Sequence, residues 1–180
     1  MMMERKIKIL GISGSLRPGS SATAVLNVVS GLVPDYVGFS IYDELETIPP
    51  FNDSNDVPLP VQRLIEYIAN ADGAFFCIPE YAFGVPGALK NALDWTVAAT
   101  AFTDKPVALI TTASQGEKAH AALLNTLTAL GTKITADTNL LISFIRSKLN
   151  EQNEIKDIAT MDAVRKVVVS LIQLIEANDR

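Results

Sequence analysis

The stretch "KIKILGISGSLRPGSSATAVLNVV", residues Lys6 to Val29, decides the fold. Its first eight residues alternate in the manner of a β-strand, and a turn rich in glycine and serine follows. Apolar side chains then recur at helical spacing, at Val25, Val28, Val29, Leu32 and Val33, which predicts one buried helix face. A strand that passes through such a turn into an amphipathic helix is typical of an α/β sheet.

The rest of the chain repeats this alternation. We expect further strands over 37–43, 73–80, 105–113 and 133–143, and helices over 61–70, from Pro86 onward, over 118–130 and along 161–175. "GAFFCIPE", residues 73–80, is almost unbroken apolar sequence, as in a central strand covered on both faces. Five strands and five helices predict a parallel sheet between helix layers, in a single domain over residues 1–180.

Composition excludes several classes of function. The chain has 15 Lys and Arg against 20 Asp and Glu, a net charge of −5, and no basic block that would bind nucleic acid. No apolar run approaches the roughly 18 residues that a membrane span needs, and the N-terminus lacks a signal-peptide pattern, so we expect a cytoplasmic protein. Cys77 is expected to be a buried structural thiol, and the single His120 argues against a zinc site or a catalytic dyad.

Three loops carry the residues with chemistry: "SGSLRPGSS", "PEYAFGVPG" and "TASQGEK", which follow the first, third and fourth strands. Ligands of parallel sheets bind beyond these carboxyl ends. In the first loop, a helix N-terminus, Arg17 and the hydroxyls of Ser15, Ser20, Ser21 and Thr23 suit a phosphate monoester. The alternative is that Ser20 or Ser21 only caps the helix.

Two other phosphate motifs fit this loop poorly. Gly11, Gly14 and Gly19 lack the G-x-G-x-x-G spacing of dinucleotide sites, and the loop has no Gly-Lys-Ser/Thr ending for a triphosphate. In the second loop, Tyr81 and Phe83 have the shape to wall a flat ring, or alternatively cap the core. A phosphate subsite beside a flat, partly polar subsite is the outline of flavin mononucleotide (FMN).

"GSLRPGS" (14–20) and "PEYAFGVPGALKNALDW" (79–95) together resemble the NADPH-dependent FMN reductase family, the flavodoxin-like group of chromate, quinone and azo-dye reductases. The resemblance implies a three-layer sandwich with strand order 2-1-3-4-5. It implies that Ser15, Arg17 and Ser20, with Ser21 and Ala22 beside them, hold the FMN phosphate. The isoalloxazine would lie against Pro79, Glu80, Tyr81, Ala82 and Phe83, with Ser114 and Gly116 at its other edge.

Three positions depart from the family pattern: Ala22 and Ala82 replace asparagines, and Gly84 replaces a serine. Each removes a side-chain hydrogen-bond partner, worth about 0.5 to 1.5 kcal/mol where such a bond is made. In "LKNALDW" we interpret Lys90 and Asp94 as an i,i+4 pair, and Leu89, Leu93 and Trp95 as packing residues.

The resemblance implies an oxidoreductase that transfers a hydride from NADPH or NADH to FMN, and then reduces a quinone, azo compound, free flavin or metal oxyanion. It implies a homodimer or homotetramer, with "IPPFNDSNDVP" (48–58) reaching toward the neighbouring subunit. Two alternatives stay open: a non-enzymatic electron carrier like flavodoxin, and a family member with weakened or lost FMN binding.

Overall fold

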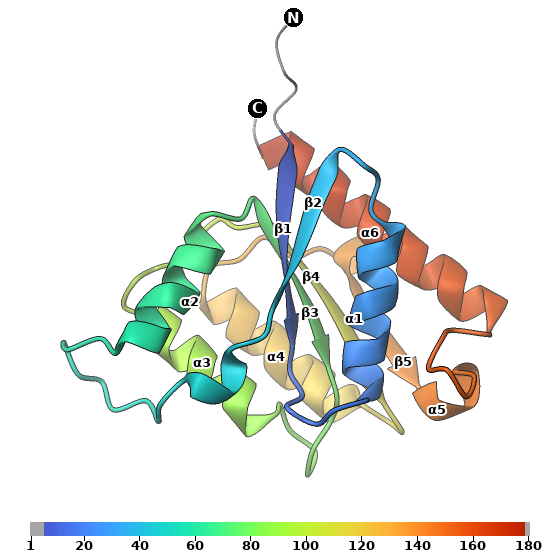
Figure 1. The fold of residues 1–180 in the computed structure, drawn as a ribbon, viewed down its shortest axis with the longest axis horizontal. Coiled ribbons are helices and arrows are strands. Elements are labelled where there is room, and N and C mark those ends of the chain that lie inside the picture. The colour runs from blue at the N-terminus through green and yellow to red at the C-terminus, as the bar shows by residue number, and fades with distance from the viewer. Residues whose placement is uncertain (1–5, 179–180) are drawn as a thin grey trace, which may run out of the picture.

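The computed structural model describes residues 6–178 and has a five-stranded sheet at its centre (Figure 1). All neighbouring strands pair in parallel, in the order β2-β1-β3-β4-β5. The strands are β1 (Ile7–Ser13), β2 (Val37–Tyr42), β3 (Gly73–Ile78), β4 (Val107–Ala113) and β5 (Asn139–Ser143). This order confirms the predicted flavodoxin-like topology.

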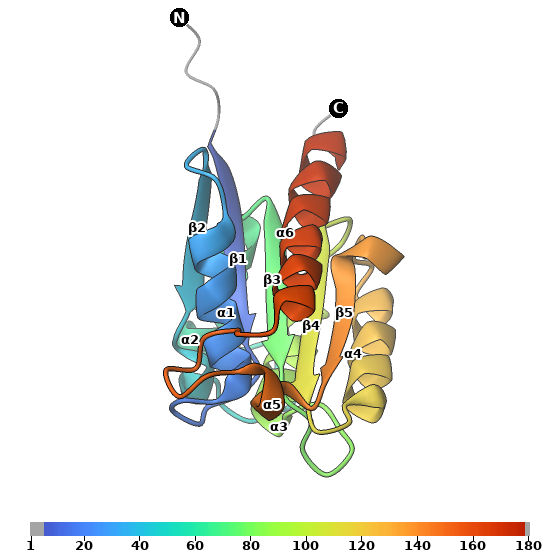
Figure 2. The same ribbon diagram turned by 90° about the vertical axis from the view of Figure 1, so that its right-hand side faces the viewer.

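Helices cover both faces of the sheet (Figures 1 and 2). One face carries α1 (Ser21–Leu32) and α6 (Ile158–Asn178), and the other carries α2 (Leu59–Ala69), α3 (Gly87–Thr96) and α4 (Glu117–Ala129). Each layer encloses its own hydrophobic cluster against the sheet. A short helix, α5 (Ile145–Lys148), lies at the carboxyl end of the strands (Figure 2).

Hydrophobic patterning accounts for these positions. All six residues of β3 are buried, as its unbroken apolar sequence predicts for a strand between two helix layers. The apolar residues expected to line one face of α6 are Met161, Val164, Val168, Leu171 and Ile175; the last four are buried and Met161 is half-buried. Cys77 lies in β3 with no exposed surface, which confirms the structural thiol. Within residues 6–178, no helix is long and apolar enough to cross a membrane.

One prediction of secondary structure was wrong, and one short helix was missed. The strand expected over 133–143 begins only at Asn139, and a 3-10 turn, η2 (Ala136–Thr138), precedes it. The hydroxyl of Thr138 accepts a hydrogen bond from the backbone N–H of Thr135 at 2.9 Å, and such local bonds compete with a sheet ladder. The short helix α5 was not predicted, because four residues contain no periodic pattern. A second 3-10 turn, η1 (Leu45–Thr47), follows β2.

The turn-rich segment after β2 is held down by α3. The backbone oxygen of Pro49 accepts hydrogen bonds at 2.9 Å from the side chains of both Asn91 and Trp95. The N–H of Phe51 donates to Asn91 Oδ1 at 2.7 Å, and the Phe51 ring packs edge-on against Trp95. The "LKNALDW" motif is therefore a docking surface for this segment. Its predicted Lys90–Asp94 ion pair is confirmed, at 2.5 Å.

Candidate functional site

Two adjoining cavities open at the carboxyl ends of the strands. The arginine-lined cavity, about 320 Å³, is lined by Arg17, Ser21, Pro79, Glu80, Tyr81, Thr112, Ala113, Ser114, Phe144, Ile145, Arg146 and Ser147. The phenylalanine-lined cavity, about 430 Å³, is lined by Glu80, Ala82, Phe83, Ala113, Ser114, Gln115 and Phe144. Four residues line both, and both volumes lie in the range of small-molecule sites.

The first loop brings anion-binding groups to the arginine-lined cavity. Ser20 is the N-cap of α1, and its hydroxyl accepts a hydrogen bond from the N–H of Thr23 at 3.1 Å. The N–H groups of Ser21 and Ala22, in the first turn, have no intrahelical acceptor. Arg17 is exposed in front of this turn, so a guanidinium, a hydroxyl and a helix N-terminus converge where an anion is favoured.

The capping alternative for Ser20 is also realised, because its side chain is buried and already bonded. The methyl of Ala22 is fully buried against the cluster under α1. The side chain of Ala22 is thus unavailable to a ligand, and Ala22 lines neither cavity. An asparagine at this position would need space that the cluster now fills.

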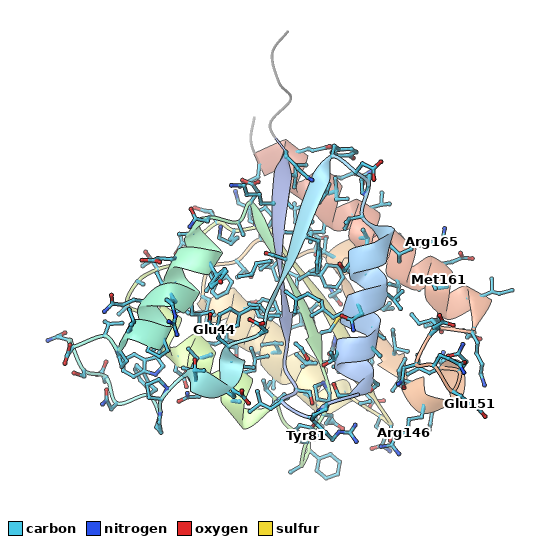
Figure 3. All side chains as sticks on the ribbon, in the orientation of Figure 1. Glu44, Tyr81, Arg146, Glu151, Met161 and Arg165 are labelled. Atoms are coloured by element: carbon cyan, nitrogen blue, oxygen red, sulfur yellow. The ribbon has the colours of Figure 1, made fainter. Side chains whose placement is uncertain are left out.

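Tyr81 connects the second loop to the first. Its hydroxyl lies 3.0 Å from Ser15 Oγ, and Ser15 Oγ also accepts the N–H of Arg17 at 3.2 Å. Figure 3 shows Tyr81 and Arg146 projecting from the same end of the molecule. Ser15 is itself 8% exposed and lines neither cavity. Its contact with Tyr81 fixes the wall between the phosphate loop and the second loop.

Glu80 holds the second loop to the third. Its carboxylate accepts hydrogen bonds from the backbone N–H of Gly116 at 3.3 Å and of Ala119 at 3.0 Å. These groups belong to the N-cap and first turn of α4, so Glu80 caps a helix from a different loop. Gly116 has a φ of 100°, and a Cβ there would lie 2.7 Å from Leu141 Cδ1. Gly116 shapes the turn and lines neither cavity.

Residues 81–84 form a tight two-residue turn in which Tyr81 and Gly84 exchange backbone hydrogen bonds at 3.1 and 2.9 Å. The central residues Ala82 and Phe83 have φ values of 48° and 61°. Turns of this type favour Asn and Gly at both positions. Replacement of the family's asparagine by Ala82 therefore costs backbone strain, a cause that the sequence reasoning did not identify.

The fourth wall of the site comes from residues that the sequence reasoning missed. Phe144 lines both cavities, and Arg146 and Ser147 line the arginine-lined cavity. Phe144 directly follows β5, and its N–H donates to the oxygen of Ser114 at 3.1 Å. The carboxyl-end rule, applied to this strand as well, would have found it.

The cavities thus bring together eight of the twelve predicted cofactor-binding residues: Arg17, Ser21, Pro79, Glu80, Tyr81, Ala82, Phe83 and Ser114. The other four predicted residues line neither cavity: Ser15, Ser20, Ala22 and Gly116. Within residues 6–178 no group of three His, Cys, Asp or Glu side chains has the arrangement of a metal site.

The profile of the family described as NADPH-dependent FMN reductase matches residues 7–146, which include both signature loops and the start of α5. The chain belongs to this family. An NAD(P)H-dependent FMN reductase of Pseudomonas aeruginosa is 33% identical over 97% of this chain and 96% of its own length. A quinone reductase of Escherichia coli is 29% identical over 89% of this chain and 90% of its own.

A solved structure is also similar: the flavoenzyme FerB, an NAD(P)H:(acceptor) oxidoreductase from Paracoccus denitrificans. It superposes with a TM-score of 0.83 at 25% identity, over 96% of this chain and 98% of its own. These findings confirm the predicted family, and with it an oxidoreductase that uses FMN and NAD(P)H.

The residues present fit FMN in their chemistry. The arginine-lined cavity offers a guanidinium, hydroxyls and a helix N-terminus, the donor set that a phosphate requires. The cavity beside it offers exposed aromatic side chains and backbone, which suit a flat ring with a polar rim. The two cavities share Glu80, Ala113, Ser114 and Phe144, so one elongated ligand can occupy both.

Proposed function

We propose that this enzyme reduces a small-molecule acceptor with electrons from NAD(P)H, and that a quinone is its first acceptor class. Azo compounds, free flavin and metal oxyanions are further candidates. The observation that carries the proposal is the pair of joined cavities, with an anion-binding end under α1 and an open aromatic end at Phe83 and Phe144. A site open over its aromatic end admits two flat substrates in turn.

The proposed roles follow the geometry. Arg17, Ser21 and the N–H groups that open α1 bind the FMN phosphate, and Ser15 and Ser20 hold that loop in place. Pro79, Tyr81, Ala82 and Phe83 line the ring, and Ser114 lies at its far edge. The redox chemistry, acceptance of a hydride from NAD(P)H and its delivery to the acceptor, is supplied by FMN when it is bound.

The chain itself contributes binding and orientation. The carboxylate among the lining residues, Glu80, is engaged by two backbone N–H groups of α4. Both ring nitrogens of His120 have partners, with Nδ1 2.9 Å from Thr111 Oγ1 and Nε2 3.3 Å from Asn139 Oδ1. In the overall balance, NAD(P)H supplies two electrons and one proton to the quinone, and solvent supplies the second proton.

We further propose a cytoplasmic homodimer or homotetramer in which segment 48–58 contacts the neighbouring subunit. Asn91 and Trp95 fix the first part of this segment, while residues 52–56 are exposed. Light scattering coupled to gel filtration tests the assembly. A monomer at micromolar concentration would contradict it.

The test of function is NADPH oxidation by protein loaded with FMN, followed in the presence of 1,4-naphthoquinone. We expect steady turnover that stops when NADPH is exhausted. Bound FMN without turnover would instead identify a non-enzymatic electron carrier like flavodoxin. A colourless protein that stays unbound in an FMN titration would identify a scaffold that has lost its cofactor.

A further inference from the structure

Two phenylalanines that line the phenylalanine-lined cavity are unusual in their exposure and in their backbone conformation. Phe83 is 70% exposed and Phe144 is 67% exposed, although burial is the rule for this residue type. Both also have left-handed backbone conformations, with φ values of 61° and 55°, which bulky side chains rarely adopt. Exposed aromatic rings held in strained conformations at one cavity indicate a binding role.

Local hydrogen bonds explain how these conformations are maintained. The paired backbone bonds between Tyr81 and Gly84 enclose Phe83. Phe144 donates its N–H to Ser114, and its oxygen accepts the N–H of Ser147 at 3.0 Å and the Ser147 hydroxyl at 2.8 Å. Both rings are thus presented by fixed turns. A preorganised pair of aromatic surfaces suits a flat ring system.

A cationic group stands beside this pair. Arg146 lies two residues after Phe144, is exposed and lines the adjoining cavity together with Phe144. None of the described residues forms an ion pair with Arg146. Glu80, the one carboxylate lining either cavity, is bonded to the first turn of α4. In a chain of net charge −5, this leaves a positive charge available to an anion.

We propose that Phe83, Phe144 and Arg146 form a binding site for flat aromatic acceptors that carry an anionic group, such as sulfonated or carboxylated quinones. Phe83 and Phe144 contact the aromatic system and leave one of its faces free for the flavin, and the guanidinium pairs with the sulfonate or carboxylate. The preference for anionic acceptors rests on the proposed function. The binding site itself does not, because an inert ligand of the same shape tests it without turnover.

The binding arm compares naphthalene-2-sulfonate with neutral 2-naphthol by calorimetric titration of the FMN-loaded protein. Arg146→Gln is expected to raise the Kd of the sulfonate roughly 10-fold, as for loss of a charge-assisted contact, and to leave that of 2-naphthol within about 2-fold. Phe144→Ala is expected to weaken both ligands by roughly 3- to 10-fold, the range of an aromatic pair. The matched control Arg165→Gln, on α6 and away from this end (Figure 3), should change neither.

The kinetic arm compares 1,4-naphthoquinone-2-sulfonate with 1,4-naphthoquinone. The ratio of their kcat/KM values should fall about 10-fold in Arg146→Gln and stay constant in Arg165→Gln. If the proposed function is wrong, the wild type will turn over neither quinone. The calorimetric titrations would still show whether Phe144 and Arg146 bind the aromatic anion. The proposal is overturned if Arg146→Gln weakens both ligands equally, or if it weakens FMN binding instead, because Arg146 would then belong to the cofactor.

Discussion

Glu80 joins two loops of the site, and its removal should loosen both. Glu80→Ala leaves the N–H groups of Gly116 and Ala119 without the acceptor that they have at 3.3 and 3.0 Å. The side chain of Ala119 is fully buried, so water reaches its N–H poorly. A buried unsatisfied donor costs about 1 to 3 kcal/mol, and loss of a helix cap costs about 0.5 to 2 kcal/mol.

The cost of the unsatisfied donor and the cost of the lost cap describe the same lost bonds, so they are not added. We therefore expect Glu80→Ala to lower the free energy of unfolding by about 2 kcal/mol. For a chain of this length that corresponds to a drop in Tm of about 4 to 8 °C. Glu80→Gln keeps one oxygen as acceptor but loses the charge, so its Tm should lie about midway between those of the wild type and Glu80→Ala. Thermal unfolding followed by circular dichroism measures both.

Hydrogen exchange separates this cause from a general loss of stability. The amide of Ala119 should exchange faster in Glu80→Ala even where amides of β3 remain protected. Glu151→Ala, at an exposed carboxylate, is the control. A Tm within about 1 °C of that control, with unchanged exchange at Ala119, would refute the capping role.

Three further predictions concern stability and reactivity. Ala82→Gly should stabilise the protein by about 0.5 to 1 kcal/mol because it relieves a left-handed φ, whereas Ala121→Gly inside α4 should destabilise it by about 1 kcal/mol; urea unfolding of both decides, and equal signs would contradict the argument. Burial lowers the pKa of His120, against a smaller opposite effect of its bond to Asn139, so the unfolded state binds the proton more readily and the free energy of unfolding should fall as pH drops below about 6.5; His120→Gln should flatten that slope, and an unchanged slope would assign it elsewhere. Burial raises the pKa of the Cys77 thiol, so a thiol reagent should label it only at the rate of unfolding; rapid labelling of the native protein would contradict its place in β3.

The fold was predictable because hydrophobic periodicity is a local property. The apolar run of β3 and the stripe along α6 identify a central strand and a one-sided helix without knowledge of any contact. The segment before β5 misled the prediction, because Thr135 and Thr138 satisfy each other locally. In the sequence, two threonines that bond to each other cannot be told from the threonines of a β-strand.

The site was predictable in its loops and less so in its contacts. Glu80 appeared in the right loop, but its bonds cross 36 and 39 residues to α4, and no spacing rule predicts such a pair. Phe144 lies between β5 and the four-residue helix α5, and Arg146 lies within that helix. Both line one cavity with Arg17, a placement that depends on how α5 packs against β4 and has no local signal in the sequence.

The central claim is that the loop before α1 binds the phosphate of FMN. The most direct test is titration of the protein with FMN and with riboflavin, which lacks the phosphate, followed by quenching of flavin fluorescence. We expect wild-type protein to bind FMN at least 10-fold more tightly than riboflavin, and Arg17→Ala to remove most of this difference by loss of a charge-assisted contact. Equal affinity for the two flavins in wild-type protein would contradict it.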